Sequence, residues 1–236
     1  MAYIPLTSFI VSVIFAILVL DQYFARRKSF QLVWAIGLLM YGIGAFTEFY
    51  TERFGLHDLA YRLWYFFGAI CSAAYLGQGT VQLLMRGRRA NIFLAILLAA
   101  TIYAAVYVFT VSIDLSSITT LTGGVMPANI RLLTGLFNIY GTVALVGGAA
   151  WSAWIFWRKR ILPYRVVSNI LIALGAMMPA LGGSLLVAGS SRAPFYSLEL
   201  AGIVIIFLGF LRNKEVFGIY RFPLIHGFKK LPESKQ

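Results

Sequence analysis

The sequence predicts an all-α integral membrane protein, a bundle of seven transmembrane helices with an outside N-terminus and a cytoplasmic C-terminus. First, 60% of the 236 residues are hydrophobic and only 12% are charged, whereas soluble domains carry about 25% charged residues. Second, the apolar residues gather in seven long stretches, each close to the ~20 residues that a helix needs to cross a bilayer. Third, the basic residues gather between alternate pairs of these stretches.

The seven stretches are expected to be helices because the bilayer core holds no water, so each segment must bond its own backbone groups. None shows the strict alternation of an outer-membrane strand. The expected spans lie near residues 4–24, 31–50, 60–84, 91–112, 132–156, 165–188 and 196–212. They form one transmembrane domain, 1–212, followed by a basic aromatic tail, 213–236. The first span is expected to be retained, because its basic cluster follows the apolar run, the reverse of a secretory signal.

The basic residues set the expected orientation. Sixteen of the 20 basic residues follow the first, third, fifth and seventh spans. The other four lie in or beside the second, fourth and sixth connections: Arg53, Arg62, Arg131 and Arg192. The 16 are Arg26, Arg27, Lys28, Arg86, Arg88, Arg89, Arg158, Lys159, Arg160, Arg165, Arg212, Lys214, Arg221, Lys229, Lys230 and Lys235. Because Lys and Arg are enriched in cytoplasmic loops, the connections that hold them are expected to face the cytoplasm. The net charge of +12 therefore indicates contact with anionic lipid at the cytoplasmic face, and nucleic acid is not expected as a partner.

Small residues predict which helix faces pack together. Residues four apart share a face, and small ones let helices approach closely in lipid. Three spans carry such a pattern: Ala69, Ala73 and Gly77; Ala144, Gly148 and Ser152; and Ala176, Ala180 and Ser184. Pro179 is expected to kink the sixth span, because proline removes one helical hydrogen bond.

A faint internal similarity is compatible with a 3+1+3 parallel repeat. Residues 35–44 of the second span and 173–182 of the sixth share Ala, Gly, Met and Gly at equivalent positions. Spans one to three and five to seven would then be two triplets of equal orientation joined by the fourth, as in some transporters. Four matches also arise by chance in apolar segments, so both explanations stay open.

Aromatic residues near the span ends are expected to form belts at the two membrane interfaces. The inner group is Trp34, Trp151, Trp154 and Trp157, and the outer group is Tyr61, Trp64 and Tyr65.

Several chemistries find no support in the sequence. The spans carry no charge at mid-depth, where ion-coupled pumps usually bury one. The seventh span has no lysine for retinal, and the two histidines, His57 and His226, fall outside the spans. The lone Cys71 allows neither an internal disulfide nor a cysteine-based metal cluster. No catalytic residue, metal or cofactor is therefore predicted, and an enzyme is the least favoured class.

Polar side chains gather instead at the outer ends of four spans. They lie about one turn inside the helices, and charges at that depth tend to turn inward and pair. We expect Glu48, Arg62, Arg131 and Glu199 to converge there, with Tyr41 and Asn138 towards the floor. One interpretation is a set of ion pairs that lock the helix ends. The other is an outward-opening cleft for a small polar ligand, with a catalytic carboxylate pair as a third reading.

Two function classes follow from this pattern. The first is a plasma (inner) membrane protein that binds a small polar ligand or facilitates its passage. The second is a receptor or interaction subunit that signals through a separate protein docked on the tail. In number and orientation the spans resemble those of SWEET sugar transporters, opsins and the seven-helix sensor regions of some bacterial kinases, a likeness of fold alone.

Overall fold

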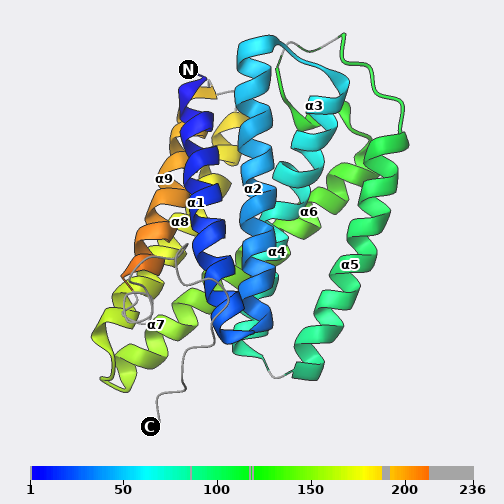
Figure 1. The fold of residues 1–236 in the computed structure, drawn as a ribbon. Helices are drawn as coiled ribbons and strands as arrows, with labels where there is room; N and C mark the ends of the chain where they lie inside the picture. Colours follow the sequence, from blue (N-terminus) through cyan, green and yellow to red (C-terminus); the bar gives the residue numbers. More distant parts are fainter. Residues whose placement is uncertain (1, 86, 117, 119, 188–191, 213–236) are drawn as a thin grey trace.

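The computed structural model describes residues 2–85, 87–116, 118, 120–187 and 192–212. All regular structure in these ranges is helical, and the helices lie side by side as one bundle (Figure 1). The long helices are α1 (Tyr3–Arg26), α2 (Ser29–Phe54), α5 (Gly87–Thr110), α8 (Pro163–Val187) and α9 (Arg192–Leu211). Two further helical stretches are composite: α3 (Asp58–Leu63), η1 (Trp64–Cys71) and α4 (Ser72–Leu84); and α6 (Ala128–Thr142), η3 (Val143–Gly147) and α7 (Gly148–Arg158). A short 3₁₀ turn, η2 (Gly123–Val125), lies between α5 and α6.

Six helices in the described residues are long and apolar enough to cross a membrane. They are Tyr3–Arg26, Ser29–Phe54, Gly87–Thr110, Ala128–Arg158, Pro163–Leu185 and Arg192–Leu211. The protein is therefore a multi-pass helical membrane protein, as the composition predicts.

The remaining stretch, Asp58–Leu84, is the third along the chain. It is helical throughout but is not one of these six. It lies in the middle of the main core cluster, where Tyr61, Ile70, Cys71 and Ala74 are all 0% exposed. A helix enclosed by other helices needs no lipid-facing apolar surface, so it can carry more polar residues than its neighbours. The edge helix α5 shows the opposite pattern, because its large apolar side chains are mostly exposed.

The third and fifth helical stretches cross very closely. A Cβ added at Gly141 would lie 2.3 Å from the backbone carbon and oxygen of Ala73, and one at Gly77 would lie 2.6 Å from the Gly141 oxygen. Further along, a Cβ at Gly148 would lie 2.4 Å from Thr80 Cγ2. The small-residue faces expected on these two stretches are confirmed as packing faces.

The small-residue face expected on the sixth span is wrong. Ala180 and Ser184 are exposed in α8. The close contact with α9 uses Gly175 instead, where an added Cβ would lie 2.7 Å from the Gly202 oxygen. This helix therefore carries small residues on two faces. The face with Gly175 packs against α9, because glycine allows the closer backbone approach.

The outer aromatic group does not form a belt. Tyr61, Trp64 and Tyr65 are 0%, 8% and 2% exposed and belong to the core. Their i, i+3, i+4 spacing puts all three rings on the buried face of the central helix. On α7, by contrast, Trp151, Trp154 and Trp157 are exposed, as an interfacial belt requires.

The two ends of the bundle differ in their connections (Figure 1). The α1–α2, α4–α5 and α7–α8 turns lie at one end, called the basic end because it holds the Arg and Lys clusters. The α2–α3 turn and the long α5–α6 connection lie at the other, called the loop end. The tail, 213–236, which carries the expected partner contact, lies outside the described residues.

Candidate functional site

A buried carboxyl group, that of Glu48, marks the site near the loop end of α2. Glu48 is 3% exposed, and Trp64 Nε1 donates a 2.9 Å hydrogen bond to its Oε1. Oε2 is also buried and accepts no hydrogen bond from a donor in the described residues. A buried polar atom without a partner is rare enough in folded proteins to need an explanation.

A second carboxyl group faces Glu48 across the helix interface. Glu199 of α9 lies within hydrogen-bonding reach of the Glu48 carboxyl group. Tyr41 ties the two helices together, because its hydroxyl donates to the backbone oxygen of Glu199 (3.0 Å). Ionised carboxylates only accept hydrogen bonds, so this acidic pair, Glu48 and Glu199, requires a shared proton or a cation.

Beside the acidic pair, a short hydrogen-bonded chain joins Arg192, Tyr196 and Glu52. Tyr196, 1% exposed, donates its hydroxyl to Oε1 of the exposed Glu52 (3.1 Å). Arg192 Nη1 donates to the Tyr196 hydroxyl (3.1 Å), and the Arg192 guanidinium also acts electrostatically on Glu48. The acidic pair thus lies one side chain away from a carboxylate at the protein surface.

Thr51 adds a second buried acceptor on the same face of α2. It lies three residues after Glu48, so the two side chains are neighbours on the helix surface. Thr51 Oγ1 is buried and has no hydrogen-bond partner among the residues that the structure describes. In this helix Thr47, by comparison, bonds its hydroxyl to the Ile43 and Gly44 carbonyls.

The α5–α6 connection encloses the site at the loop end. Arg192 Nη2 donates to the Leu121 carbonyl, and Tyr61 donates to the Thr122 carbonyl (2.8 Å). Leu121 itself is 1% exposed, so this stretch is packed into the core as a cover.

The same connection carries a hollow of about 430 Å³ on its surface, lined in part by Asp114 and Thr122. Ser116 donates its hydroxyl and its backbone N–H to Asp114 Oδ1 (2.6 and 2.9 Å). These two bonds hold the pKa of Asp114 below its usual value, because they favour the ionised carboxylate. The hollow therefore has one ionised carboxylate in its lining.

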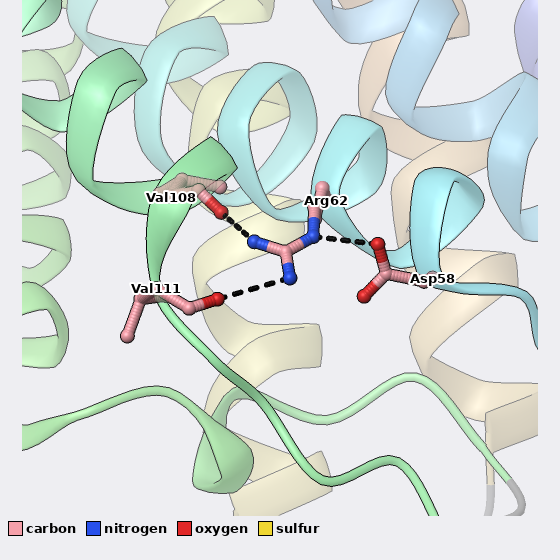
Figure 2. Close-up of polar contacts among 4 residues, drawn as sticks. All are labelled: Asp58, Arg62, Val108 and Val111. Carbon is pink, nitrogen blue, oxygen red and sulfur yellow. Dashed lines mark hydrogen bonds and ion pairs between the residues drawn. The ribbon is translucent and has the colours of Figure 1, made fainter.

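Arg62 lies apart from the acidic pair and caps α5 (Figure 2). Its Nε donates to Asp58 Oδ2 (2.7 Å), and its two terminal nitrogens donate to the carbonyls of Val108 and Val111. The last carbonyls of a helix have no intrahelical donor, and a cation there is also favoured by the helix dipole. The arrangement gives Arg62 a structural role at the helix end.

Arg131 and Asn138 are also placed away from the pair. Arg131 is exposed at the start of α6, close enough to Tyr65 to interact electrostatically. Asn138 Nδ2 donates to the Ala69 carbonyl (2.7 Å) and to the Thr134 carbonyl (2.9 Å). Ala69 belongs to the π-helical segment η1, so Asn138 ties α6 to the irregular part of the central helix.

The expected convergence of four charged residues is therefore wrong for Arg62 and Arg131, whereas Glu48 and Glu199 do lie together. Glu48, Glu199 and Tyr41 lie together. Arg62 lies at the end of α5 and Arg131 at the start of α6. The arginine that does face the pair is Arg192. It could have been found from its spacing, since residues 192, 196 and 199 follow the i, i+4, i+7 pattern of one helix face.

Comparison with known proteins leaves this geometry as the basis for function. The chain matches no protein-family model, no curated protein and no solved structure. The functional argument must rest on the acidic pair and on Glu48 Oε2, which accepts no hydrogen bond from a described donor.

Proposed function

We propose that the protein binds a small cationic ligand at the acidic pair, which the ligand reaches from the loop end. The observation that carries the proposal is the enclosed pair itself: the Glu48 carboxyl group lies within hydrogen-bonding reach of Glu199, and its Oε2 is buried and accepts no hydrogen bond from a described donor. Ionisable residues within a membrane span are costly and usually functional, so their default reading is a ligand or ion site.

The charge balance favours a cation. Three carboxyl groups, those of Glu48, Glu52 and Glu199, lie around one guanidinium, that of Arg192. The free groups, Glu48 Oε2 and Thr51 Oγ1, offer acceptor lone pairs to a metal ion or an ammonium group. The dense packing of Tyr196 and the Leu121 cover favours a ligand of a few atoms, such as a monovalent cation or a small protonated amine.

The orientation follows from the charge distribution. We place the N-terminus and the loop end outside and the basic end in the cytoplasm of the plasma (inner) membrane, in line with the positive-inside rule. The acidic pair would then be reached from outside. The 3+1+3 parallel repeat belongs to this proposal, because a repeat-built bundle suits a facilitative carrier.

A receptor is the second candidate, and one observation favours it. Trp64, which donates to Glu48, is the first residue of the π-helical segment η1. Such segments occur often at functional sites. A ligand that competes for Glu48 would act directly on this segment and could alter the central helix without being transported. Cation flux into liposomes separates the two candidates, since the receptor predicts binding without flux.

A thermal-shift assay on the purified protein tests the site. Sodium, potassium or methylammonium chloride is compared with N-methylglucamine chloride, a cation too bulky to enter, at constant ionic strength. We expect at least one small cation to raise Tm in the wild type, and Glu48→Gln and Glu199→Gln to abolish that shift. Asp114→Asn is the matched control, because it removes an exposed carboxylate at the same end and should keep the shift. A wild type without any cation-specific shift, or a shift kept in both Gln variants, would refute the proposal.

A further inference from the structure

A second hollow lies at the opposite end of the bundle, in the turn between α7 and α8. Its volume is about 660 Å³. Arg158 and Arg160 line it, together with apolar side chains that include Phe156, Trp157 and Ile161. The hollow thus combines guanidinium groups with an apolar wall at a membrane-facing helix end.

The charge around this hollow is positive and has no acidic neighbour in sequence. Arg158, Lys159 and Arg160 are consecutive and exposed, and Arg165 follows one turn into α8. The chain carries no Asp or Glu between Asp114 and Glu199, so the whole α6–α8 region supplies only cations.

Aromatic rings hold two of these cations in place. The Arg158 guanidinium lies 5.3 Å from the centroid of the Trp154 ring, and that of Arg165 lies 5.4 Å from the Phe156 ring. Such cation–π contacts restrict the side chains without neutralising their charge. The Arg158 guanidinium, which lines the hollow, therefore keeps its positive charge.

Positive φ angles and backbone hydrogen bonds fix the conformation of the turn between α7 and α8. Arg160 and Leu162 adopt left-handed conformations, both with φ of 51°. The N–H of Ile161 donates to the Phe156 carbonyl (3.2 Å), and that of Arg160 donates to the Trp157 carbonyl (3.1 Å). These bonds terminate α7 tightly and fix the spacing of the two lining arginines.

We propose that this hollow binds the phosphate-bearing headgroup of an anionic glycerophospholipid. The planar guanidinium fork matches phosphate oxygens in pairs, which makes arginine the preferred residue for such groups. Trp157, 68% exposed, lines the hollow, and Trp154, 42% exposed, lies about one turn before it along α7. They provide an apolar path on which the acyl chains lie, which a soluble phosphate would not need. The inference does not depend on the acidic pair.

Reconstitution in vesicles tests this site. The purified protein is placed in phosphatidylcholine vesicles with or without phosphatidylglycerol, and Tm is measured in each. We expect phosphatidylglycerol to raise the wild-type Tm by several degrees and Arg158→Gln/Arg160→Gln to lose most of that shift. The control, Arg88→Gln/Arg89→Gln, removes the same charge from the first turn of α5 at the same end and should keep the shift.

Three outcomes would overturn the proposal: no wild-type shift, equal losses in both double variants, or a full shift with soluble glycerol phosphate. The last result would assign the site to a free phosphate.

A second measurement works on the wild-type fold. Phosphatidylglycerol brominated on its acyl chains should quench tryptophan fluorescence more strongly than equally brominated phosphatidylcholine. Trp157→Phe should reduce that difference. Equal quenching by the two lipids, or an unchanged difference in Trp157→Phe, would contradict a headgroup site beside this side chain.

Discussion

The crossing of α4 and α6 yields the sharpest stability prediction, because one methyl group meets backbone there. In Gly141→Ala, the new Cβ would lie 2.3 Å from the carbon and oxygen of Ala73 and 2.7 Å from the nitrogen of Ala74. Backbone atoms cannot rotate aside as a flexible side chain can. The two helices would have to separate by about 1 Å to reach the 3.4 Å of ordinary contact.

The control lies on the same helix. Gly135 has no atom within 4 Å of an added Cβ. Gly→Ala gains about 1 kcal/mol of helix propensity at either position, so the difference between the two variants isolates the packing cost. Overpacking typically costs about 1–3 kcal/mol.

The assay is Tm of both variants in one detergent, followed by intrinsic fluorescence. At roughly 2–4 °C per kcal/mol for a chain of this size, Gly141→Ala should melt about 2–12 °C below Gly135→Ala. Equal melting temperatures would refute the close crossing, because they would show that the two helices are not in backbone contact.

The remaining predictions concern helix ends and orientation. Arg62→Met should cost about 1–3 kcal/mol of stability, because it leaves the α5 carbonyls without a donor; Arg53→Met, at an exposed site in the last turn of α2, should change Tm little. Gly148→Leu should lower Tm through its clash with α4, whereas Gly147→Leu, which points into open space, should not; the same Tm in both would place Gly148 towards lipid. Reporter fusions should give a cytoplasmic signal in the α4–α5 turn and an external one in the α5–α6 connection, and the opposite pattern would reverse the topology.

The helix positions could be predicted because hydropathy depends on one segment at a time. Each expected span coincides largely with one helical stretch, and most helices begin a few residues earlier, as in Ser29–Phe54 against the expected 31–50. The expected 91–112 and 196–212 run past the helix ends at Thr110 and Leu211, and 165–188 ends on a residue outside the described ranges. The residues that the expected spans leave out include charged ones at the helix ends, such as Glu52 and Arg53, which are helical without being apolar. The central stretch is predicted as a span from its apolar length, and its aromatic residues as an interfacial belt; in the structure those aromatic residues are part of the core instead.

The site could be predicted only in part, because sequence gives depth along a helix but not the direction that a face takes in the bundle. Glu48 and Glu199 meet because α2 and α9 turn these faces towards each other. Arg62 lies at a similar depth, yet its face is turned to the end of α5. Trp64, two residues further and about 200° around the helix, is the side chain that reaches Glu48. Only the tertiary arrangement could distinguish these two neighbours.

The proposal that the acidic pair binds a small cation implies that the cation displaces a proton which the two carboxyl groups otherwise share. Infrared difference spectroscopy measures this directly, because a protonated carboxyl group has a carbonyl band that a carboxylate lacks. Adding the cation that shifts Tm should remove such a band in the wild type, and Glu199→Gln should abolish the change. An identical difference spectrum in Glu199→Gln, or no carboxyl change in the wild type at a saturating cation concentration, would contradict the account.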